Sequence, residues 1–186
     1  NQSYVATLQT GQGHQDAWNG FMATWLAEAG LPNTAIPAAV AMLKAEHDIK
    51  YLWRQLPEGL VEAITALRAA GFKTGIISNS EGRLAELFAE LELLALFDVL
   101  LDSKVEGLRK PDPAFFLRAC KRLKLAPERC LYAGDIPEVD VVGARSAGLE
   151  AVLIDAFDLY PNYTQAPRFD SVSALCHTLI HSAPRP

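Results

Sequence analysis

The stretch RCLYAGDIPEVDVVGARSAGLEAVLID, residues 129–155, decides the fold class. It contains a short apolar run that ends at Gly134 and Asp135, an amphipathic segment that ends at Gly148, and a second apolar run. Apolar runs of this length favour strands, and the segment between them has the apolar spacing of a helix. A strand, a helix and a strand in this order form a right-handed crossover between parallel strands. We therefore predict an α/β fold with a parallel sheet.

The same alternation extends in both directions and covers residues 57–186. Strands of this kind that alternate with helices form a doubly wound sheet, which is covered by helices on both faces. We therefore expect residues 57–186 to form one α/β core. The predicted helices span residues 58–71, 82–94, 113–125, 139–148 and 170–182, and the predicted strands span residues 72–78, 97–103, 129–135 and 150–155.

Residues 1–56 have a different pattern, which is helical throughout. Trp18 and Trp25 belong to an apolar stripe with steps of three and four residues, within a predicted helix over residues 16–30. A second helix is predicted to start at Pro37, because proline is favoured in the first turn of a helix. We predict that this region is a separate helical unit and that its aromatic stripe is its core.

Composition and charge exclude several classes of protein. The chain has 186 residues, half of them hydrophobic, and a net charge of −5. Neutralising phosphates requires a basic surface, so a general nucleic-acid-binding protein is not expected. The longest apolar runs, such as residues 93–101, are too short to span a bilayer, so a membrane protein is not expected either. The three cysteines are few and far apart, which favours reduced, buried thiols and a cytoplasmic location.

Polar residues follow the predicted strands in a suggestive order. Ser78 and Asn79 come at the end of one strand, just before a helix, where free backbone donors suit a phosphate oxygen. Lys110 stands beside prolines that stiffen its backbone, and Asp135 and Asp140 follow another strand. Each feature alone is common: a helix cap, a surface lysine and a turn. In a doubly wound fold, however, they meet beyond the carboxyl ends of the strands, where ligands bind.

These residues resemble the motifs of the haloacid dehalogenase-like (HAD) hydrolase superfamily. GIISN, with Ser78, resembles the second motif of the family, and KPDP, with Lys110, resembles the third. GDIPEVD, with Asp135 and Asp140, resembles the fourth, and the intervals between the three motifs are typical of the family. The resemblance covers residues 57–155 in detail and the helical region more loosely.

The resemblance implies a Mg²⁺-dependent phosphatase that acts on a small phosphorylated metabolite through an aspartyl-phosphate. Ser78 and Lys110 would be the catalytic residues that bind phosphoryl oxygens, and Asn79 would bind the substrate beside them. Asp135 would be a metal ligand, and Asp140 would hold either the metal shell or Lys110. The fold would be a HAD-like Rossmannoid core, and residues 1–56 would be an α-helical cap of the kind that closes over a site and sets its specificity.

The family's first motif, Asp-x-Asp, which supplies the nucleophile, does not occur in the chain. Residues 1–13 contain no acidic residue. One explanation is that the natural protein has an upstream segment with the first strand and its aspartates, which the missing initiator methionine also suggests. A second is a degenerate motif in which Ser3 and Val5 replace both acids, and a third is that the family assignment is wrong. The first is favoured, because a sheet without its central strand leaves two edges and much of its core exposed.

Two other functions are also compatible with the sequence. A non-catalytic HAD-like protein could bind a phosphate, a metal or a partner through the remaining site. A 2-haloacid dehalogenase is the alternative among enzymes, and in the family that activity needs no metal. Turnover of a phosphate ester with Mg²⁺, and halide release in the presence of a chelator, separate these functions from a phosphatase.

Overall fold

A computed structural model of the chain describes residues 14–182. The chain divides into two compact units, Asn1–Gln55 and Leu56–Pro186. Ser3 and Val5, where the degenerate motif was considered, lie outside the described residues. The mixed α/β architecture with parallel strands confirms the predicted fold class.

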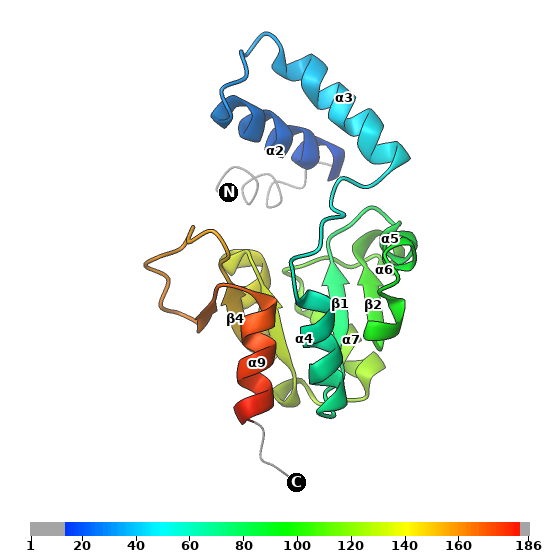
Figure 1. Cartoon of the computed structure of the whole chain (residues 1–186), viewed down its shortest axis with the longest axis vertical. Helices are drawn as coiled ribbons and strands as arrows, with labels where there is room; N and C mark the ends of the chain where they lie inside the picture. Colours follow the sequence, from blue (N-terminus) through cyan, green and yellow to red (C-terminus); the bar gives the residue numbers. More distant parts are fainter. Residues whose placement is uncertain (1–13, 183–186) are drawn as a thin grey trace. The chain divides into compact units, whose positions relative to one another are not determined.

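Within residues 14–55, the first unit contains two helices, α2 (His14–Glu28) and α3 (Ile36–Ile49) (Figure 1). Trp18 of α2 is buried against His47 of α3, with ring centroids 5.6 Å apart. The His47 ring also meets Tyr51 edge-on at 4.8 Å. Trp25 of the same predicted stripe is 55% exposed, so only part of the stripe is core. The reason is geometric, because two helices can bury only one narrow face of each other.

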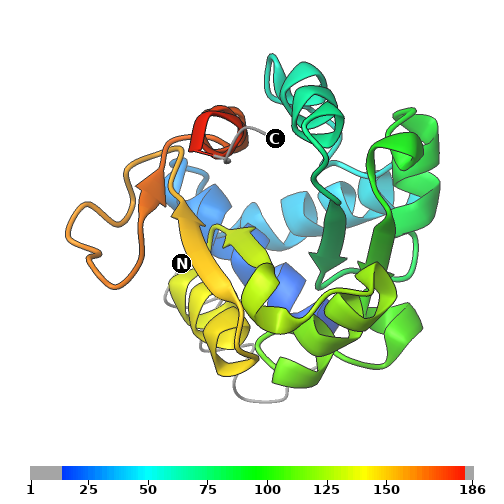
Figure 2. The ribbon, with the colours of Figure 1, turned by 90° about the horizontal axis from the view of Figure 1, so that it is seen from below.

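The described part of the second unit, residues 56–182, has five short strands in two parallel sheets. β1 (Gly75–Ser78) pairs with β2 (Val99–Asp102), and β3 (Leu131–Gly134) pairs with β4 (Glu150–Ile154), which pairs with β5 (Arg168–Phe169). Figure 2 shows β1 and β3 as neighbours in the middle of this layer. No strand pairing joins them among residues 14–182.

Helices cover both faces of the strands (Figure 2). α4 and α9 pack against each other on one face, and α7 and α8 lie on the other. The elements of the second unit besides the strands are α4 (Leu60–Ala69), α5 (Leu84–Glu90), α6 (Ser103–Glu106), α7 (Pro113–Leu123), α8 (Val142–Ser146), α9 (Val172–Ser182), the 3₁₀ turns η1 (Leu94–Leu96) and η2 (Pro127–Arg129), and the π-helical turn η3 (Pro137–Val141).

Helix α7 connects the two sheets through two adjacent phenylalanines. Phe115 is fully buried against Leu101 of β2, and Phe116 is fully buried against residues of β4 and α8 such as Leu153. Gly143 of α8 lies so close to α7 that a Cβ atom there would come within 2.8 Å of the Phe116 ring. These close contacts hold the carboxyl ends of β1 and β3 in one unit.

The two inner strands are less buried than the strands that flank them. Three of the four residues of β2 are buried, and so are the three middle residues of β4. All four residues of β1 and all four of β3 are only partly buried or exposed. In a doubly wound sheet the inner strands are normally buried on both faces. Within residues 14–182, the facing edges of β1 and β3 are therefore the least covered part of this core.

Three local features differ from the sequence predictions. The predicted helix over residues 82–94 ends at Glu90, and Glu92 with a positive φ of 58° precedes the separate turn η1. The predicted helix from residue 139 starts as the π-helical turn η3. Strand β5 was not predicted, because two residues are too few to show a periodic pattern.

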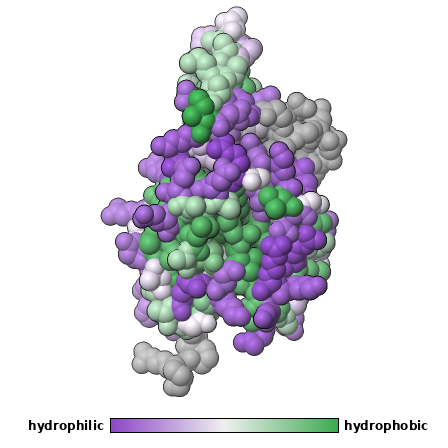
Figure 3. Space-filling view, turned by 90° about the vertical axis from the view of Figure 1, so that its right-hand side faces the viewer, coloured by the Kyte–Doolittle hydropathy of each residue, from purple (hydrophilic) through white to green (hydrophobic). Residues whose placement is uncertain are grey.

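The surface of the second unit, viewed from the side of α5 and α6, mixes polar and apolar residues (Figure 3). Leu94 and Val105 are examples of exposed apolar side chains, at 47% and 69%. Within residues 14–182, no helix has the length and apolar character needed to cross a membrane.

Candidate active site

The centre of the candidate site is the ammonium group of Lys110. Its Nζ donates to Oδ1 of Asp140 over 2.7 Å and to the hydroxyl of Tyr132 over 2.9 Å. The side chain of Lys110 is only 13% exposed, and that of Asp140 is 1% exposed. A buried ion pair of this geometry is held in one arrangement, since either partner alone would be costly to bury.

Asp140 also fixes the turn that follows β3. Its Oδ2 accepts hydrogen bonds from the backbone N–H groups of Asp135 and Ile136, each over 3.0 Å. The π-helical turn η3 brings the side chain back over the end of β3. A Cβ atom at Gly134 would lie 2.4 Å from Cγ of Asp140, so only glycine fits there. This explains the Gly-Asp pair of the motif: the glycine makes room for the second aspartate.

Asn79 holds the backbone of Lys110. Its Nδ2 donates to the carbonyl oxygen of Lys110 over 3.0 Å, and its Oδ1 accepts from the N–H of Lys110 over 2.8 Å. The Lys110–Pro111 peptide bond is cis. The side-chain amide of Asn79 therefore acts within the protein, and its predicted contact with substrate stays a prediction.

A second buried aspartate, Asp102 at the end of β2, holds the loop that follows β1. Its carboxylate accepts from the backbone N–H groups of Gly82, Leu84 and Lys104 at 2.9–3.2 Å. Ser103 adds a reciprocal pair of hydrogen bonds with the backbone of Ser80, each over 3.0 Å. The loop between Ser78 and α5 is thus tied to β2 at several points.

Ser78 is the last residue of β1 and lies opposite Asp102 in the register. It is partly buried, and it precedes Asn79, which is bonded to Lys110. The structure therefore brings Asn79, Lys110 and Asp140 together through direct contacts. It places Ser78 at the same edge through the chain, without a hydrogen bond that joins its hydroxyl to that group within the described part of the chain.

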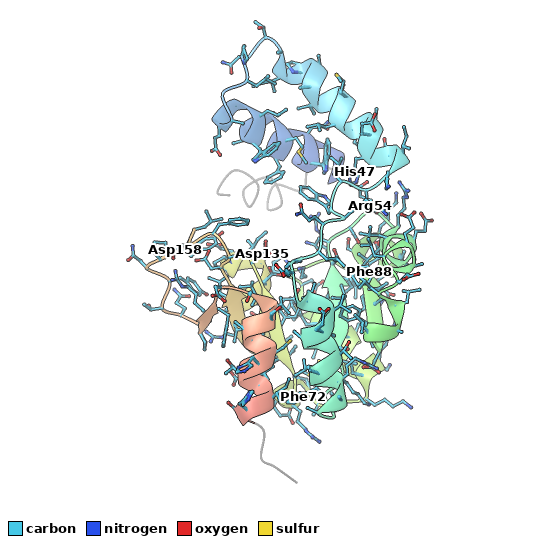
Figure 4. All side chains as sticks on the ribbon, viewed as in Figure 1. His47, Arg54, Phe72, Phe88, Asp135 and Asp158 are labelled. Carbon is cyan, nitrogen blue, oxygen red and sulfur yellow. The ribbon has the colours of Figure 1, made fainter. Side chains whose placement is uncertain are left out.

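Asp135 lies at the open side of the site. Figure 4 shows it at the carboxyl end of the strand layer, at the opposite end from Phe72. Its side chain is exposed, unlike that of Asp140. Partial desolvation and the nearby negative charge of Asp140 raise the pKa of Asp135 above its ordinary value. Crowded carboxylates at one edge of a sheet are an environment that a cation would stabilise.

Lys110 and Tyr132 keep their ordinary charge states at neutral pH. Burial by itself would favour the neutral amine of Lys110, but its contacts with Tyr132 and Asp140 raise the pKa of Lys110 above its ordinary value. Burial also raises the pKa of Tyr132, so its hydroxyl keeps its proton. The site therefore contains one fixed cation and two carboxylates.

The residues present fit a magnesium ion better than a metal held by the protein alone. Among residues 14–182, no group of three or more His, Cys, Asp or Glu side chains could hold a metal. Mg²⁺ commonly binds through one or two carboxylates and completes its shell with water and substrate phosphate. The exposed Asp135 suits that role. Both oxygens of Asp140 already accept hydrogen bonds, which favours the alternative role considered for it, that of holding Lys110.

Two residues of the site were missed by sequence reasoning. Tyr132 stands within a predicted strand, where an aromatic residue indicates packing rather than a polar role. Asp102 ends a predicted strand, where an acidic residue indicates a helix cap or a turn. Its bond to Lys104 N is such a cap, but its bonds to Gly82 and Leu84 are long-range contacts that local sequence does not show.

Comparisons with known proteins agree with this geometry. The family described as haloacid dehalogenase-like hydrolase matches residues 2–148. The chain belongs to this family. This HAD-like hydrolase is 28% identical, over 148 residues, to the mouse haloacid dehalogenase-like hydrolase domain-containing protein 3, with 79% of this chain and 59% of that protein covered. It is 30% identical, over 115 residues, to the glyceraldehyde 3-phosphate phosphatase of Methanopyrus kandleri, with 61% and 49% covered.

Solved structures support the fold. The HAD-like hydrolase superposes on a magnesium-bound HAD hydrolase of Bacillus subtilis with a TM-score of 0.69 and 20% identity, and the match covers 96% of this chain and 78% of that one. At this identity the match supports the fold alone. The chain spans about half the length of the curated relatives that it matches.

Proposed function

We propose that this HAD-like hydrolase is a Mg²⁺-dependent phosphatase that acts on a small phosphorylated metabolite. The observation that carries the proposal is the buried Lys110 ammonium, which Asp140 and Tyr132 hold at the edge where the exposed Asp135 also lies. A fixed cation beside an exposed carboxylate suits a phosphoryl group and its metal ion. Relatives with printed phosphatase names, among them those for glyceraldehyde 3-phosphate and phosphoglycolate, support the same reaction class.

Each residue of the site would have one task in this reaction. Lys110 would donate to a phosphoryl oxygen and stabilise the charge that develops there, and the hydroxyl of Ser78 would bind a second oxygen. Asp135 would hold Mg²⁺ at the open side, and water and the substrate phosphate would complete the shell of the ion. The bound ion would offset the repulsion between an attacking carboxylate and the phosphate. Asp140 would keep Lys110 in place.

The attacking carboxylate is expected on a strand that belongs between β1 and β3. The facing edges of these strands make no strand pairing within residues 14–182, and both strands are only partly buried. A parallel strand in that position would end between Ser78 and Asp135 and could deliver an aspartate to the phosphate. We propose that this aspartate lies upstream of residue 1, because residues 1–13 contain no acid. The helical unit would then be the cap that shapes the substrate pocket.

The first experiment is to measure the intact mass of the natural protein and then its turnover of p-nitrophenyl phosphate. We expect a mass above 20.3 kDa and hydrolysis that requires millimolar Mg²⁺ and stops in EDTA. D135N should lower kcat by about 100-fold or more, since it removes the charge that binds the metal ion. E138Q, a change at an exposed glutamate three residues away, is the matched control and should leave kcat unchanged.

Other results would point to other functions. A mass of 20.3 kDa without turnover would favour a non-catalytic protein that binds a phosphate or a partner. Halide release from a 2-haloacid that persists in EDTA would favour a dehalogenase. Turnover that is unchanged in D135N would contradict the metal assignment. The three free cysteines, two of them buried, support a reducing compartment, and we propose the cytoplasm.

A further inference from the structure

Tyr132 contacts the ammonium group of Lys110, and its own task in the proposed reaction has not yet been defined. It lies on β3, and its ring packs edge-on against Phe116 with centroids 5.0 Å apart. Its hydroxyl lies 2.9 Å from Nζ of Lys110 and 3.3 Å from Oδ1 of Asp140. The carbonyl oxygen of Ile77, on β1, is 3.4 Å away. A single hydroxyl therefore contacts the lysine, its counter-ion and the neighbouring strand.

Counting donors shows what this hydroxyl does to the lysine. An ammonium group has three N–H donors and no acceptor. Asp140 accepts one and Tyr132 accepts a second, so one donor is left among the contacts of residues 14–182. The hydroxyl has one proton of its own, which it can donate to Asp140 or to the carbonyl of Ile77. The bonds therefore run in one direction, from Lys110 through Tyr132 to the acceptors.

We propose that Tyr132 is a positioning residue of the phosphoryl-transfer site, whose hydroxyl fixes the Lys110 ammonium so that its third N–H is available to a phosphoryl oxygen. This inference rests on the proposed phosphatase function and adds a residue to it. Asp140 alone would hold the ammonium at one point and leave it free to rotate. The second contact, from another direction, removes that freedom before substrate binds, which is how preorganised donors stabilise a transition state.

Packing alone does not account for the hydroxyl. Phenylalanine would keep the ring contact with Phe116, so the oxygen matters only through its hydrogen bonds. Tyr163 offers a comparison within the same core. Its hydroxyl is buried and has no hydrogen-bond partner in the described part of the chain, although its ring packs against the same apolar cluster as Tyr132. Tyr132 and Tyr163 thus pack against the same core, and of these two only Tyr132 hydrogen-bonds to the lysine.

The test compares Y132F with Y163F in the full-length protein. With p-nitrophenyl phosphate and saturating Mg²⁺, we expect kcat of Y132F to fall about tenfold while KM stays within about twofold, because the lost bond acts on the charged donor. Y163F should change neither constant by more than about twofold. Equal losses in both variants, or no loss in Y132F, would overturn the proposal.

A second measurement does not depend on activity. In the wild-type protein, the ¹H–¹⁵N resonance of the Lys110 ammonium, assigned through K110R, should be protected from exchange and show a nuclear Overhauser effect to the Tyr132 ring. The protection should be lost in Y132F and kept in Y163F. Absence of this nuclear Overhauser effect in the wild-type protein would contradict the proposed role of Tyr132.

The phosphatase function and the role of Tyr132 can be overturned independently of each other. A wild-type protein without turnover that still shows the ammonium contact would overturn the phosphatase function on which the inference rests. A wild-type protein that turns over but shows the same kcat in Y132F would overturn the role of Tyr132 and leave the phosphatase function intact.

Discussion

Two buried aspartates stand near the ends of neighbouring strands, and they differ in what they bind. Asp102, at the end of β2, is 6% exposed and accepts only backbone N–H groups among the described contacts. Asp140, after β3, is 1% exposed and divides its oxygens between two backbone N–H groups and the Lys110 ammonium. Both aspartates hold a loop through backbone N–H groups, but only Asp140 also binds a charged side chain, that of Lys110. The difference shows that the donors around a buried acid, rather than its burial, indicate its role.

The largest effect on stability and activity is expected for Asp140, which both holds the turn after β3 and binds Lys110. D140N removes the counter-ion of a buried lysine and weakens the bonds to residues 135 and 136, so the free energy of unfolding should fall by about 3 kcal/mol. We expect kcat to fall by about 100-fold or more, since Lys110 loses its position. Urea unfolding and steady-state kinetics on the full-length protein measure both. A variant with normal kcat would show that Asp140 is only structural.

The same substitution at the other aspartate should separate stability from activity. D102N replaces one carboxylate oxygen, which accepts N–H bonds, with an amide nitrogen, which cannot accept them, so the free energy of unfolding should fall by about 2 kcal/mol. Because Asp102 touches no charged group of the site, kcat should fall by less than about tenfold. If D102N lowered kcat as much as D140N does, the proposed difference in role between the two aspartates would be wrong.

A third acid near the end of β2 gives the smallest effect and a pH dependence. Glu106 binds Arg118 and Arg122 of α7, and these contacts lower the pKa of Glu106 below its ordinary value of 4.5, with the Arg118 hydrogen bond as the largest cause. A lowered pKa means that the stabilisation is present above about pH 4.5 and is lost as pH falls through the lower, folded-state value.

The magnitude is modest, because the two arginines are partly exposed. E106Q should lose about 1 kcal/mol of unfolding free energy at pH 7 and less at pH 3. Urea midpoints of the wild type and E106Q at both pH values measure the difference, with E138Q as the control. A difference that is the same at both pH values would contradict the charge-based explanation.

Much of this fold could be predicted, because its strands are short apolar runs between amphipathic helices. The approach of Asn79, Lys110 and Asp140 was also predictable, since the carboxyl ends of parallel strands lie at one edge. The exact contacts were not. The amide of Asn79 binds the lysine backbone, a pairing of residues 31 positions apart that no local pattern indicates.

The remaining differences have the same physical origin. The hydroxyl of Tyr132 forms its hydrogen bonds only when the fold brings β3, Lys110 and Asp140 together. The apolar pattern of a strand does not indicate such contacts. The partial exposure of β1 and β3 likewise depends on which strands pair, whereas the apolar runs of these strands resemble those of β2 and β4.

The π-helical turn η3 places a limit on the length of the chain at this point. A π-helical turn contains one residue more than an α-helical turn, and each residue advances a helix by about 100°. Deleting one residue from Pro137–Val141 would therefore rotate Asp140 away from Gly134, even if every remaining side chain were kept. An insertion would do the same in the opposite sense. The spacing between Asp135 and Asp140 is thus set by backbone geometry. Homologues that keep this site should differ in the identity of the residues between the two aspartates but keep the number of these residues.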